Sequence, residues 1–345
     1  MNLQDILYRV SVQTIHNSTD LNIASIHFDS RKVAMGSVFV ATQGTQTDGH
    51  NFIQKAIEQG AIAVVCETLP ESLQENITYI QTSDSAEALG IMASNFFGNP
   101  SEKLQLVGIT GTNGKTTNVT LLYKLFKGLG YKVGMLSTVE NYIDEEIIPA
   151  THTTPDAISL NELLAKMVKA GCQYAFMEAS SHAIVQRRIA GLHFAGAVFT
   201  NITHDHLDFH QTFDNYIKAK KRLFDDLPKT AFALSNLDDK RGSVMLQNTK
   251  AKKCSFALKT PANFKGKVLN NTLQGLEMDF DGRAVWCRLT GTFNAYNLLG
   301  VYATAVLLGE DTERILLVLS SLSAARGRFE QIADAQNRIG IVDYA

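Results

Sequence analysis

The sequence VGITGTNGKTT at residues 107–117 decides the fold of the region around it. Its apolar start is typical of a buried strand, and a helical pattern follows it. A strand, a glycine-rich loop and a helix in this order place backbone N–H groups and a helix N-terminus around one point, which favours a bound phosphate. The strict phosphate-loop pattern requires glycine where this chain has Ile109, so the match is the shorter Gly111-x-x-Gly114-Lys115-Thr116-Thr117. The alternative is an ordinary glycine turn.

Length and composition limit the class of protein. A chain of 345 residues, 45% of them hydrophobic, predicts a globular protein of two or three domains. A net charge of −2 gives no basic field for nucleic acid or an anionic membrane. The four cysteines are far apart and form no C-x-x-C pair, which favours reduced thiols. The N-terminus has no secretory signal pattern and no apolar run approaches the ~18 residues of a membrane span, so a cytoplasmic location is predicted.

The first hundred residues are predicted to form a small α/β domain. Strands at 37–42 and 61–67 flank a helix at 51–59. A further helix within 86–100 ends at a glycine and a proline, which places the first domain boundary at residue 100.

Residues 101–330 are predicted to form a second α/β domain. Its strands are nearly continuous in apolar residues, which is typical of a parallel sheet with helices on both faces. These strands are predicted at 132–138, 173–179, 195–201 and 230–236, with helices at 158–170, 215–227 and 294–309 and short strands within 254–293. The chain stops inside an apolar strand at 339–342, so 331–345 is interpreted as the start of a further domain that is truncated.

Two segments carry acidic and imidazole side chains at predicted strand ends. Glu178 ends its strand, where a carboxylate is placed to hold Mg²⁺ beside a phosphate loop. A solvent-facing carboxylate is the alternative. The segment TNITHDHLDFH at 200–210 contains three histidines and two aspartates, a composition compatible with zinc. Because neither a cysteine nor H-E-x-x-H spacing supports zinc, Mg²⁺ is favoured over zinc and over a merely polar loop.

The remaining polar motifs are less specific. The basic side chains of 215–227 are interpreted as a solvated face, because composition singles out no one lysine. The loops 236–239 and 289–297 either line a base or ribose pocket or only form turns, with Asn294 a candidate helix cap. Arg326 and Arg328 lie in a glycine turn that suits a cation brought to a phosphate by domain closure, with a surface arginine as the alternative.

Taken in order, these motifs resemble the Mur ligases, and most closely the MurE type, the UDP-N-acetylmuramoyl-tripeptide synthetases. The resemblance covers residues ~21–345 and is carried by the motifs DSR…DGH, GTNGKTT, HTTPD, MEASSH, TNITHDHLDFH, AKKRLF, LTGTFNAYN, GRFE and VDYA. It implies an N-terminal UDP-binding domain, a central ATP-binding domain and a C-terminal Rossmann-like ligase domain, which is missing here. It also implies ATP-dependent amide formation, in which the D-Glu carboxylate of UDP-MurNAc-L-Ala-D-Glu becomes an acyl phosphate that the amine of a diamino acid attacks.

The resemblance assigns roles to individual residues. Those implied in ATP binding are Gly111, Thr112, Asn113, Gly114, Lys115, Thr116, Thr117, Asn201, Asn294, Arg328 and Asp343. Those implied in binding the UDP-precursor are Phe28, Ser30, Thr45, Gln46, Thr47, Thr153, Thr154, Ser180, Gln186 and Arg188. The implied catalytic residues are Lys115, Glu178, His206 and Lys220, and the implied Mg²⁺ ligands are Thr116, Glu178, His206 and Lys220.

The resemblance implies that Lys220 acquires its role through a modification. In the family its counterpart is carbamylated on the side-chain nitrogen, which replaces a cation that would repel Mg²⁺ with a carboxylate-like ligand. This reverses the interpretation of a solvated face.

Several properties stay open from the sequence. The third amino acid, meso-diaminopimelate or L-lysine, is not readable because the domain that selects it is absent. A monomer is expected, and residues 1–345 alone are expected to ligate poorly. The alternatives are a sibling ligase that adds D-Ala-D-Ala, a folylpolyglutamate synthetase, and a non-catalytic module that binds the UDP-precursor. The non-catalytic module is disfavoured, because binding alone would not require a complete set of phosphoryl-transfer residues, here Lys115, Glu178, His206 and Lys220.

Overall fold

The computed structural model describes residues 1–44, 47–150, 152–333 and 339–344. The chain forms two compact units, which we call the N-terminal unit and the central unit. The N-terminal unit consists of Met1–Glu102, Pro155–Ala165 and Val185–Leu192, and the central unit of Lys103–Thr154, Lys166–Ile184 and His193–Ala345. Two later segments of the chain therefore belong to the N-terminal unit.

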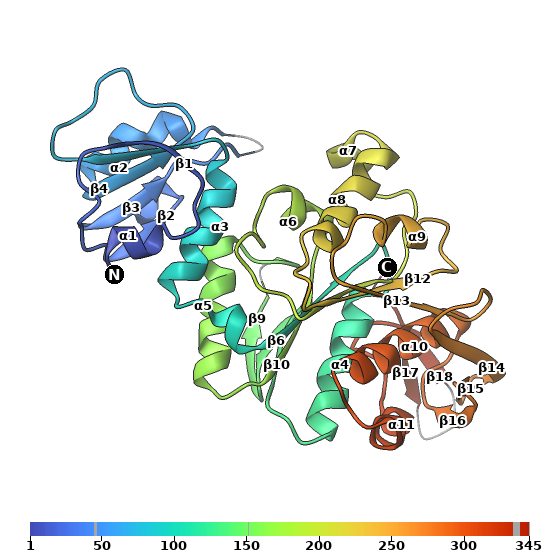
Figure 1. Cartoon of the computed structure of the whole chain (residues 1–345). Coiled ribbons are helices and arrows are strands. Elements are labelled where there is room, and N and C mark those ends of the chain that lie inside the picture. The colour runs from blue at the N-terminus through green and yellow to red at the C-terminus, as the bar shows by residue number, and fades with distance from the viewer. Residues whose placement is uncertain (45–46, 151, 334–338, 345) are drawn as a thin grey trace. The chain divides into compact units, whose positions relative to one another are not determined.

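The N-terminal unit is built on a five-stranded sheet in the order β1-β5-β4-β3-β2 (Figure 1). Its strands are β1 (Val12–His16), β2 (Ser25–His27), β3 (Ser37–Val40), β4 (Ala61–Cys66) and β5 (Thr78–Thr82). β1 is antiparallel to β5 and the other pairs are parallel. Its helices are α1 (Leu3–Ile6), α2 (Ile53–Glu58) and α3 (Ser85–Phe96), with 3-10 turns η1 (Ser30–Lys32), η2 (Gly49–Phe52) and η3 (Pro100–Lys103). The predicted strands 37–42 and 61–67 are confirmed as β3 and β4.

The central unit contains an eleven-stranded sheet in the order β16-β15-β14-β13-β12-β11-β6-β10-β7-β8-β9. The strands are β6 (Gln105–Thr110), β7 (Val133–Leu136), β8 (Glu140–Ile143), β9 (Glu146–Pro149), β10 (Tyr174–Glu178), β11 (Gly196–Phe199), β12 (Phe232–Asn236), β13 (Lys252–Ala257), β14 (Phe264–Thr272), β15 (Gly275–Phe280) and β16 (Arg283–Cys287). The strands from β14 through β12, β6 and β10 to β7 pair in parallel. The predicted parallel sheet is thus confirmed, and antiparallel hairpins extend it at both ends.

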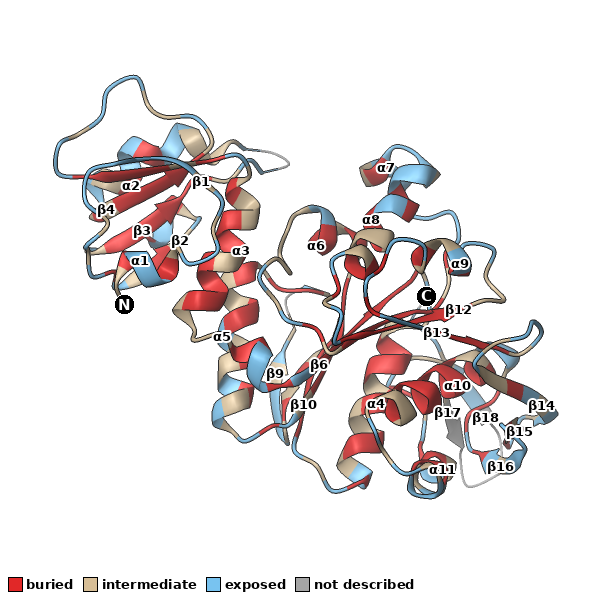
Figure 2. Cartoon of the chain, in the orientation of Figure 1, coloured by how far each residue is buried: buried red, intermediate tan, exposed pale blue. Residues whose placement is uncertain are grey.

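Helices cover both faces of this sheet. They are α4 (Lys115–Gly128), α5 (Ala157–Lys169, shared with the N-terminal unit), α6 (Ser181–Val185), α7 (Leu207–His210), α8 (Phe213–Asp225), α9 (Gly242–Met245), α10 (Thr292–Leu307) and α11 (Thr312–Ser321). Figure 1 shows α4, α10 and α11 on one face and α8 on the other. The first three share one apolar core with the sheet. Figure 2 shows the central strands buried along their length, as their continuous apolar sequences require.

Two further observations complete the fold. The predicted strand at the end of the chain is β18 (Ile339–Val342), which pairs antiparallel with β17 (Glu330–Ala333). None of the described helices combines the length and apolar character that crossing a bilayer requires. Because β6, β10, β11, β12 and β7 are parallel, their carboxyl ends meet at one edge of the sheet, where open α/β sheets bind ligands.

Candidate active site

The phosphate loop leads from β6 into α4 at this edge. Two glycines are required by close packing: a Cβ at Gly111 would lie 1.9 Å from Oγ1 of Thr200, and one at Gly114, where φ is +85°, would lie 2.7 Å from Oδ1 of Asn297. The Lys115 ammonium folds back over the loop, where Nζ donates to the carbonyls of Gly111 at 3.0 Å and Thr112 at 2.8 Å. Burial lowers the pKa of Lys115, although the negative charge of Glu178 opposes this shift.

The end of β11 holds the phosphate loop in place. The backbone N–H of Asn113 donates to Oδ1 of Asn201 at 2.9 Å, and Nδ2 of Asn201 donates back to the carbonyl of Asn113 at 3.1 Å. Oγ1 of Thr200 donates to the same carbonyl at 2.6 Å. The loop is therefore fixed by hydrogen bonds before any ligand binds, which lowers the entropic cost of binding.

Glu178 is a buried carboxylate at the end of β10. Its exposed fraction is 1%, so the interpretation as a solvent-facing carboxylate is wrong. Oε1 accepts hydrogen bonds from Oγ1 of Thr116 at 2.9 Å and from the backbone N–H of Thr138 at 2.8 Å, and Oε2 accepts from Oγ1 of Thr138 at 3.1 Å. The carboxylate thus lies beside the first turn of α4, at the hydroxyl predicted to reach Mg²⁺.

Lys220 corrects the interpretation of 215–227 as a uniformly solvated face. Lys218 on the same helix is exposed, but Lys220 is 1% exposed. Its Nζ donates to the carbonyl of Gly111 at 2.9 Å and lies 4.5 Å from the centre of the Tyr216 ring. Burial lowers the pKa of Lys220 well below its ordinary value, and repulsion from Lys115 lowers it further.

A signal for this burial exists in the sequence. Lys220 lies three residues after Ile217 and four before Phe224, so it occupies the apolar stripe of α8. A lysine within such a stripe must either extend its charge to solvent or find a polar partner inside. Here the partner is the carbonyl of Gly111 in the phosphate loop.

The histidine-rich segment divides into an exposed and a buried part. His206 begins α7 with φ +52°, and its side chain is 44% exposed, with Nε2 3.6 Å from Oδ2 of Asp205. His204 and Asp208 are exposed as well. His210 is buried, and Nε2 lies 2.9 Å from Oγ of Ser181.

Two findings describe the chemistry of these histidines. Burial, with repulsion from His182 and Lys220, lowers the pKa of His210 to about 4. Over the described ranges, no group of three or more His, Cys, Asp or Glu side chains is placed to hold a metal ion. The zinc interpretation of residues 200–210 therefore receives no support.

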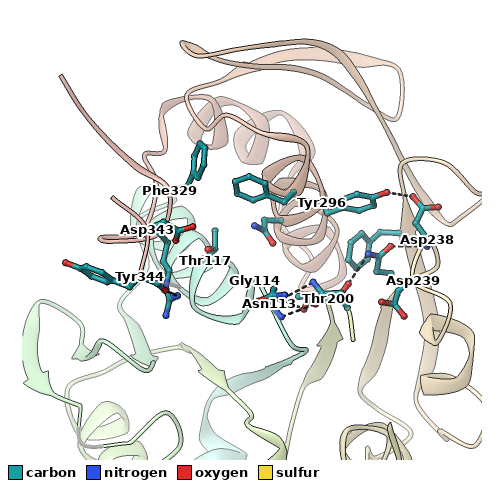
Figure 3. Close-up of a pocket in the computed structure, with 16 residues that line it drawn as sticks. Asn113, Gly114, Thr117, Thr200, Asp238, Asp239, Tyr296, Phe329, Asp343 and Tyr344 are labelled. Atoms are coloured by element: carbon teal, nitrogen blue, oxygen red, sulfur yellow. Dashed lines mark hydrogen bonds between the residues drawn. The ribbon is translucent and has the colours of Figure 1, made fainter. Parts of the chain in front are cut away.

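A cavity of about 750 Å³ opens beside the phosphate loop. Figure 3 shows Asn113, Gly114 and Thr117 on one side, with Tyr296 and the aromatic ring of Phe329 across from them. Predicted ATP-binding residues that line it are Asn113, Gly114, Thr117, Asn201, Arg328 and Asp343. Its volume is within the range of ordinary ligand pockets.

Asn294 does not line this cavity. The helix cap of α10 is Gly291, so the prediction that Asn294 caps the helix is wrong. Asn294 is buried in the first turn, where Nδ2 donates to the carbonyl of Thr290 at 2.8 Å and Oδ1 accepts from Nδ2 of Asn297 at 3.0 Å. Asn297, which the sequence did not single out, is the side chain that lines the cavity. The spacing of three residues, one helical turn, links the two asparagines.

The loop after β12 forms another wall of the cavity. Asp238 accepts hydrogen bonds from the backbone N–H groups of Leu258, Lys259 and Thr260, each at 2.8 Å, and from the Tyr296 hydroxyl at 2.9 Å. Burial opposes ionisation of Asp238, but the backbone donors outweigh it and hold the pKa at about 2. This wall therefore presents a fixed, ionised carboxylate.

The residues predicted to bind the UDP-precursor are divided between the two units. In the N-terminal unit, Phe28 is 38% exposed and Ser30 is buried in η1, while Oε1 of Gln186 accepts from Nη2 of Arg188 at 2.6 Å. In the central unit, Oγ1 of Thr154 donates to the carbonyl of Glu178 at 2.8 Å and lies 3.4 Å from Oγ of Ser180. Oγ1 of Thr153 accepts from Oγ1 of Thr138 at 3.2 Å. Thr47 is exposed. Thr45 and Gln46 are outside the described residues.

Comparison with known proteins identifies the family. Residues 109–305 match the Mur ligase middle domain, and residues 22–97 match the Mur ligase family catalytic domain. The chain belongs to the Mur ligase family. Its phosphate loop, Glu178 and Lys220 all lie within the Mur ligase middle domain match.

Two curated relatives and one solved structure share one name. The chain is 62% identical over 346 residues to the UDP-N-acetylmuramoyl-L-alanyl-D-glutamate–2,6-diaminopimelate ligase of Cytophaga hutchinsonii, covering 100% of this chain and 71% of that protein. It is 54% identical over 345 residues to the protein of the same name from Phocaeicola vulgatus, with the same coverage. A solved structure of a ligase of this name superposes with a TM-score of 0.83 at 28% identity, covering 100% of this chain and 71% of that one.

Proposed function

We propose that this chain is the N-terminal and central part of a MurE-type ligase that forms an amide between the D-Glu carboxylate of UDP-MurNAc-L-Ala-D-Glu and a diamino acid. The observation that carries the proposal is the buried Glu178 carboxylate hydrogen-bonded to Thr116 beside the phosphate loop. The relatives at 62% and 54% identity are named for 2,6-diaminopimelate, which supports meso-diaminopimelate over L-lysine. The chain acts as a monomer in the cytoplasm in this proposal, where its four buried free thiols stay reduced.

The 750 Å³ cavity is the proposed ATP site. The phosphate loop at one side supplies backbone N–H groups, the N-terminus of α4 and the Lys115 ammonium to the phosphates. At the other side, Phe293 and Phe329 lie with ring centres 5.1 Å apart and offer apolar faces to a base. Asp238 holds this wall in place, because its carboxylate already accepts hydrogen bonds from the backbone N–H groups of 258–260 and from the Tyr296 hydroxyl. The Asn297 amide, which lines the cavity, is suited to hydrogen-bond the nucleoside.

The site fits Mg²⁺ in its donor chemistry. The Thr116 hydroxyl and the Glu178 carboxylate are hard oxygen donors 2.9 Å apart, and Mg²⁺ prefers few protein ligands together with phosphate oxygens. In the proposal, His206 and a carbamylated Lys220 contribute the other ligands. A Mg²⁺ held by these residues would supply positive charge to neutralise the phosphoryl group during its transfer.

The chain's own side chains prepare this reaction. Lys115 leaves the carbonyls of Gly111 and Thr112 to meet the phosphates, because two neutral acceptors bind an ammonium less strongly than a polyanion does. Phosphorylation turns the D-Glu carboxylate, a poor electrophile, into an acyl phosphate with a good leaving group.

Binding and turnover test the proposal separately. Calorimetry of residues 1–345 with UDP-MurNAc-L-Ala-D-Glu and with ATP and Mg²⁺ should show binding, and Lys115→Met should remove the ATP signal. Release of ADP and phosphate by the full-length protein should depend on meso-diaminopimelate in a panel with L-lysine, L-ornithine and D-Ala-D-Ala. Release of ADP and phosphate with D-Ala-D-Ala alone would contradict the proposal of a MurE-type ligase. Tight precursor binding without release in any reaction would favour a binding module.

A further inference from the structure

The segment 323–328 crosses from α11 to β17 between two cavities of the central unit. Arg326 lines a cavity of about 290 Å³ together with Thr116 and Tyr142, whereas Arg328 lines the 750 Å³ cavity. Ala325 and Gly327 are buried, so alternate residues of the segment face inward. A small shift of this segment would therefore move Arg328 relative to the phosphate loop.

Lys124 anchors the start of this segment to the phosphate-loop helix. Its Nζ donates to the carbonyl of Ser323 at 3.2 Å, to Oγ of Ser323 at 3.1 Å and to the carbonyl of Ala324 at 3.0 Å. An ammonium has three N–H donors, and these three contacts use all of them. Lys124 and Lys115 belong to the same helix α4, so a rigid element links the phosphate loop to the segment.

Glu140 holds the segment from the other side. Oε1 of Glu140 lies 3.7 Å from Nη1 of Arg326, and Oε2 accepts a hydrogen bond of 2.8 Å from the Tyr142 hydroxyl. The Tyr142 ring packs on Tyr123 of α4 at 4.9 Å between ring centres. Since Arg326 is 77% exposed, this ion pair is the weaker of the two anchors.

Arg328 itself is tied at the end of the segment. Its backbone N–H donates to the carbonyl of Ala325 at 3.0 Å, and Nη1 donates to the carbonyl of Tyr344. Nε of Arg328 is buried without a hydrogen-bond partner within the described part of the chain. A buried guanidinium N–H without a partner is costly, and an anionic oxygen bound in the 750 Å³ cavity that Arg328 lines would supply the missing acceptor.

We propose that Lys124 is a positioning residue for the nucleotide site, and that Glu140 assists it: together they fix segment 323–328 so that Arg328 faces the nucleotide phosphates. This inference rests on the proposed function, because it requires the 750 Å³ cavity to bind ATP. Neither Lys124 nor Glu140 needs to touch the nucleotide. Their effect passes through Arg328.

The test is calorimetric affinity for ATP with Mg²⁺ in the chain of residues 1–345. Lys124→Met should raise the Kd for ATP about tenfold, because the loss of hydrogen bonds made by a charged group weakens binding by about this factor. Lys124→Arg, which keeps a cation with several donors, should recover most of the affinity. Lys127→Met is the matched control, since Lys127 lies on the same helix but pairs with Asp144 at 2.5 Å. Its Kd should equal that of the wild type.

A double variant separates positioning from general stability. If Lys124 acts through Arg328, then Lys124→Met combined with Arg328→Ala should bind no more weakly than Arg328→Ala alone. Glu140→Gln, which keeps the Tyr142 hydrogen bond, should raise the Kd about twofold. It replaces Lys124→Met as the test variant if Lys124→Met does not fold. Additive losses, or a Kd for Lys124→Met equal to that of Lys127→Met, would overturn the inference while leaving the proposed function intact. Absence of ATP binding by the wild type would overturn both.

Discussion

Oγ1 of Thr116 donates a hydrogen bond of 2.9 Å to Oε1 of Glu178, although the two residues are 62 positions apart in the chain. The bond joins the first turn of α4 to the end of β10 in a buried environment. It places a hydroxyl and a carboxylate side by side next to the phosphate loop. In the proposed reaction these two oxygen donors face the same Mg²⁺.

Glu178→Gln is expected to lower ligase activity at least a hundredfold while changing the free energy of unfolding by about 1 kcal/mol or less, because the amide keeps the shape but not the charge. Glu178→Ala should also destabilise the chain by about 1–3 kcal/mol, since it leaves the backbone N–H of Thr138 without an acceptor. ADP release and urea unfolding measure the two effects. Glu146→Gln, on the exposed strand β9, is the control. Equal activity of Glu178→Gln and this control would exclude a charge requirement.

Lys220→Met is expected to abolish turnover yet stabilise the unmodified chain by about 1 kcal/mol or more at neutral pH. The pKa of Lys220 is lowered in the folded state, mainly by burial, so the unfolded chain binds more protons between that pKa and the ordinary value of 10.5. Stability of the wild type therefore falls as pH drops below 10.5, and the variant should lose this slope. Urea unfolding at several pH values without bicarbonate measures it. Lys218→Met, on the exposed face of the same helix, should keep the wild-type slope.

The proposed carbamylation of Lys220 has its own test. Activity should fall when bicarbonate is removed, and Lys220→Ala should be rescued by short carboxylic acids, which restore a carboxylate at the site. Full activity of Lys220→Ala without such additives would contradict the modification.

His210→Gln is expected to flatten the acid side of the stability profile. Burial, with repulsion from His182 and Lys220, lowers the pKa of His210 to about 4. The unfolded chain therefore binds an extra proton between about pH 6.5 and 4, and stability that is full above pH 6.5 is lost as the pH falls through this interval, by about 2 kcal/mol at pH 5 and about 3 kcal/mol at pH 4. Urea unfolding from pH 7 to 5 measures the slope. His204→Gln, exposed in the same segment, should retain it, and a retained slope in His210→Gln would assign it to other groups.

Asp84→Ala is expected to destabilise the N-terminal unit by about 2 kcal/mol. Asp84 caps α3 by accepting from the backbone N–H of Glu87 at 2.8 Å, and its other oxygen accepts from Nε of Arg187 at 3.0 Å. Asp311→Ala removes the comparable cap of α11, where Asp311 accepts from the N–H of Arg314 at 3.0 Å and has no second side-chain partner among the described residues. In urea unfolding, the free energy of unfolding should fall less in Asp311→Ala than in Asp84→Ala. Equal losses would show that the Arg187 contact contributes nothing.

The sequence by itself determined the main parallel strands of the central unit and the position of the phosphate loop, but not the short strands and helices such as β8, β9 and α11. Continuous apolar runs such as 230–236 require burial on both faces, so they predict a parallel sheet without knowledge of the neighbours. The sequence also predicted that Glu178 lies at a strand end near the loop. These are local properties, because strand and helix periodicity and glycine turns depend on residues close together in the chain.

Only the tertiary structure decided which polar side chains are buried and with what partner. Composition does not separate Lys220 from Lys218, and although its place in the apolar stripe of α8 indicates burial, its partner, the carbonyl of Gly111, is 109 residues away and follows only from the fold. Asn297 rather than Asn294 reaches the cavity, because the packing of α10 buries Asn294, whose amide bonds to Thr290 and Asn297. Long-range contacts of this kind follow from how elements pack, and the electrostatic cost of burying a charge is set by those contacts rather than by sequence neighbours.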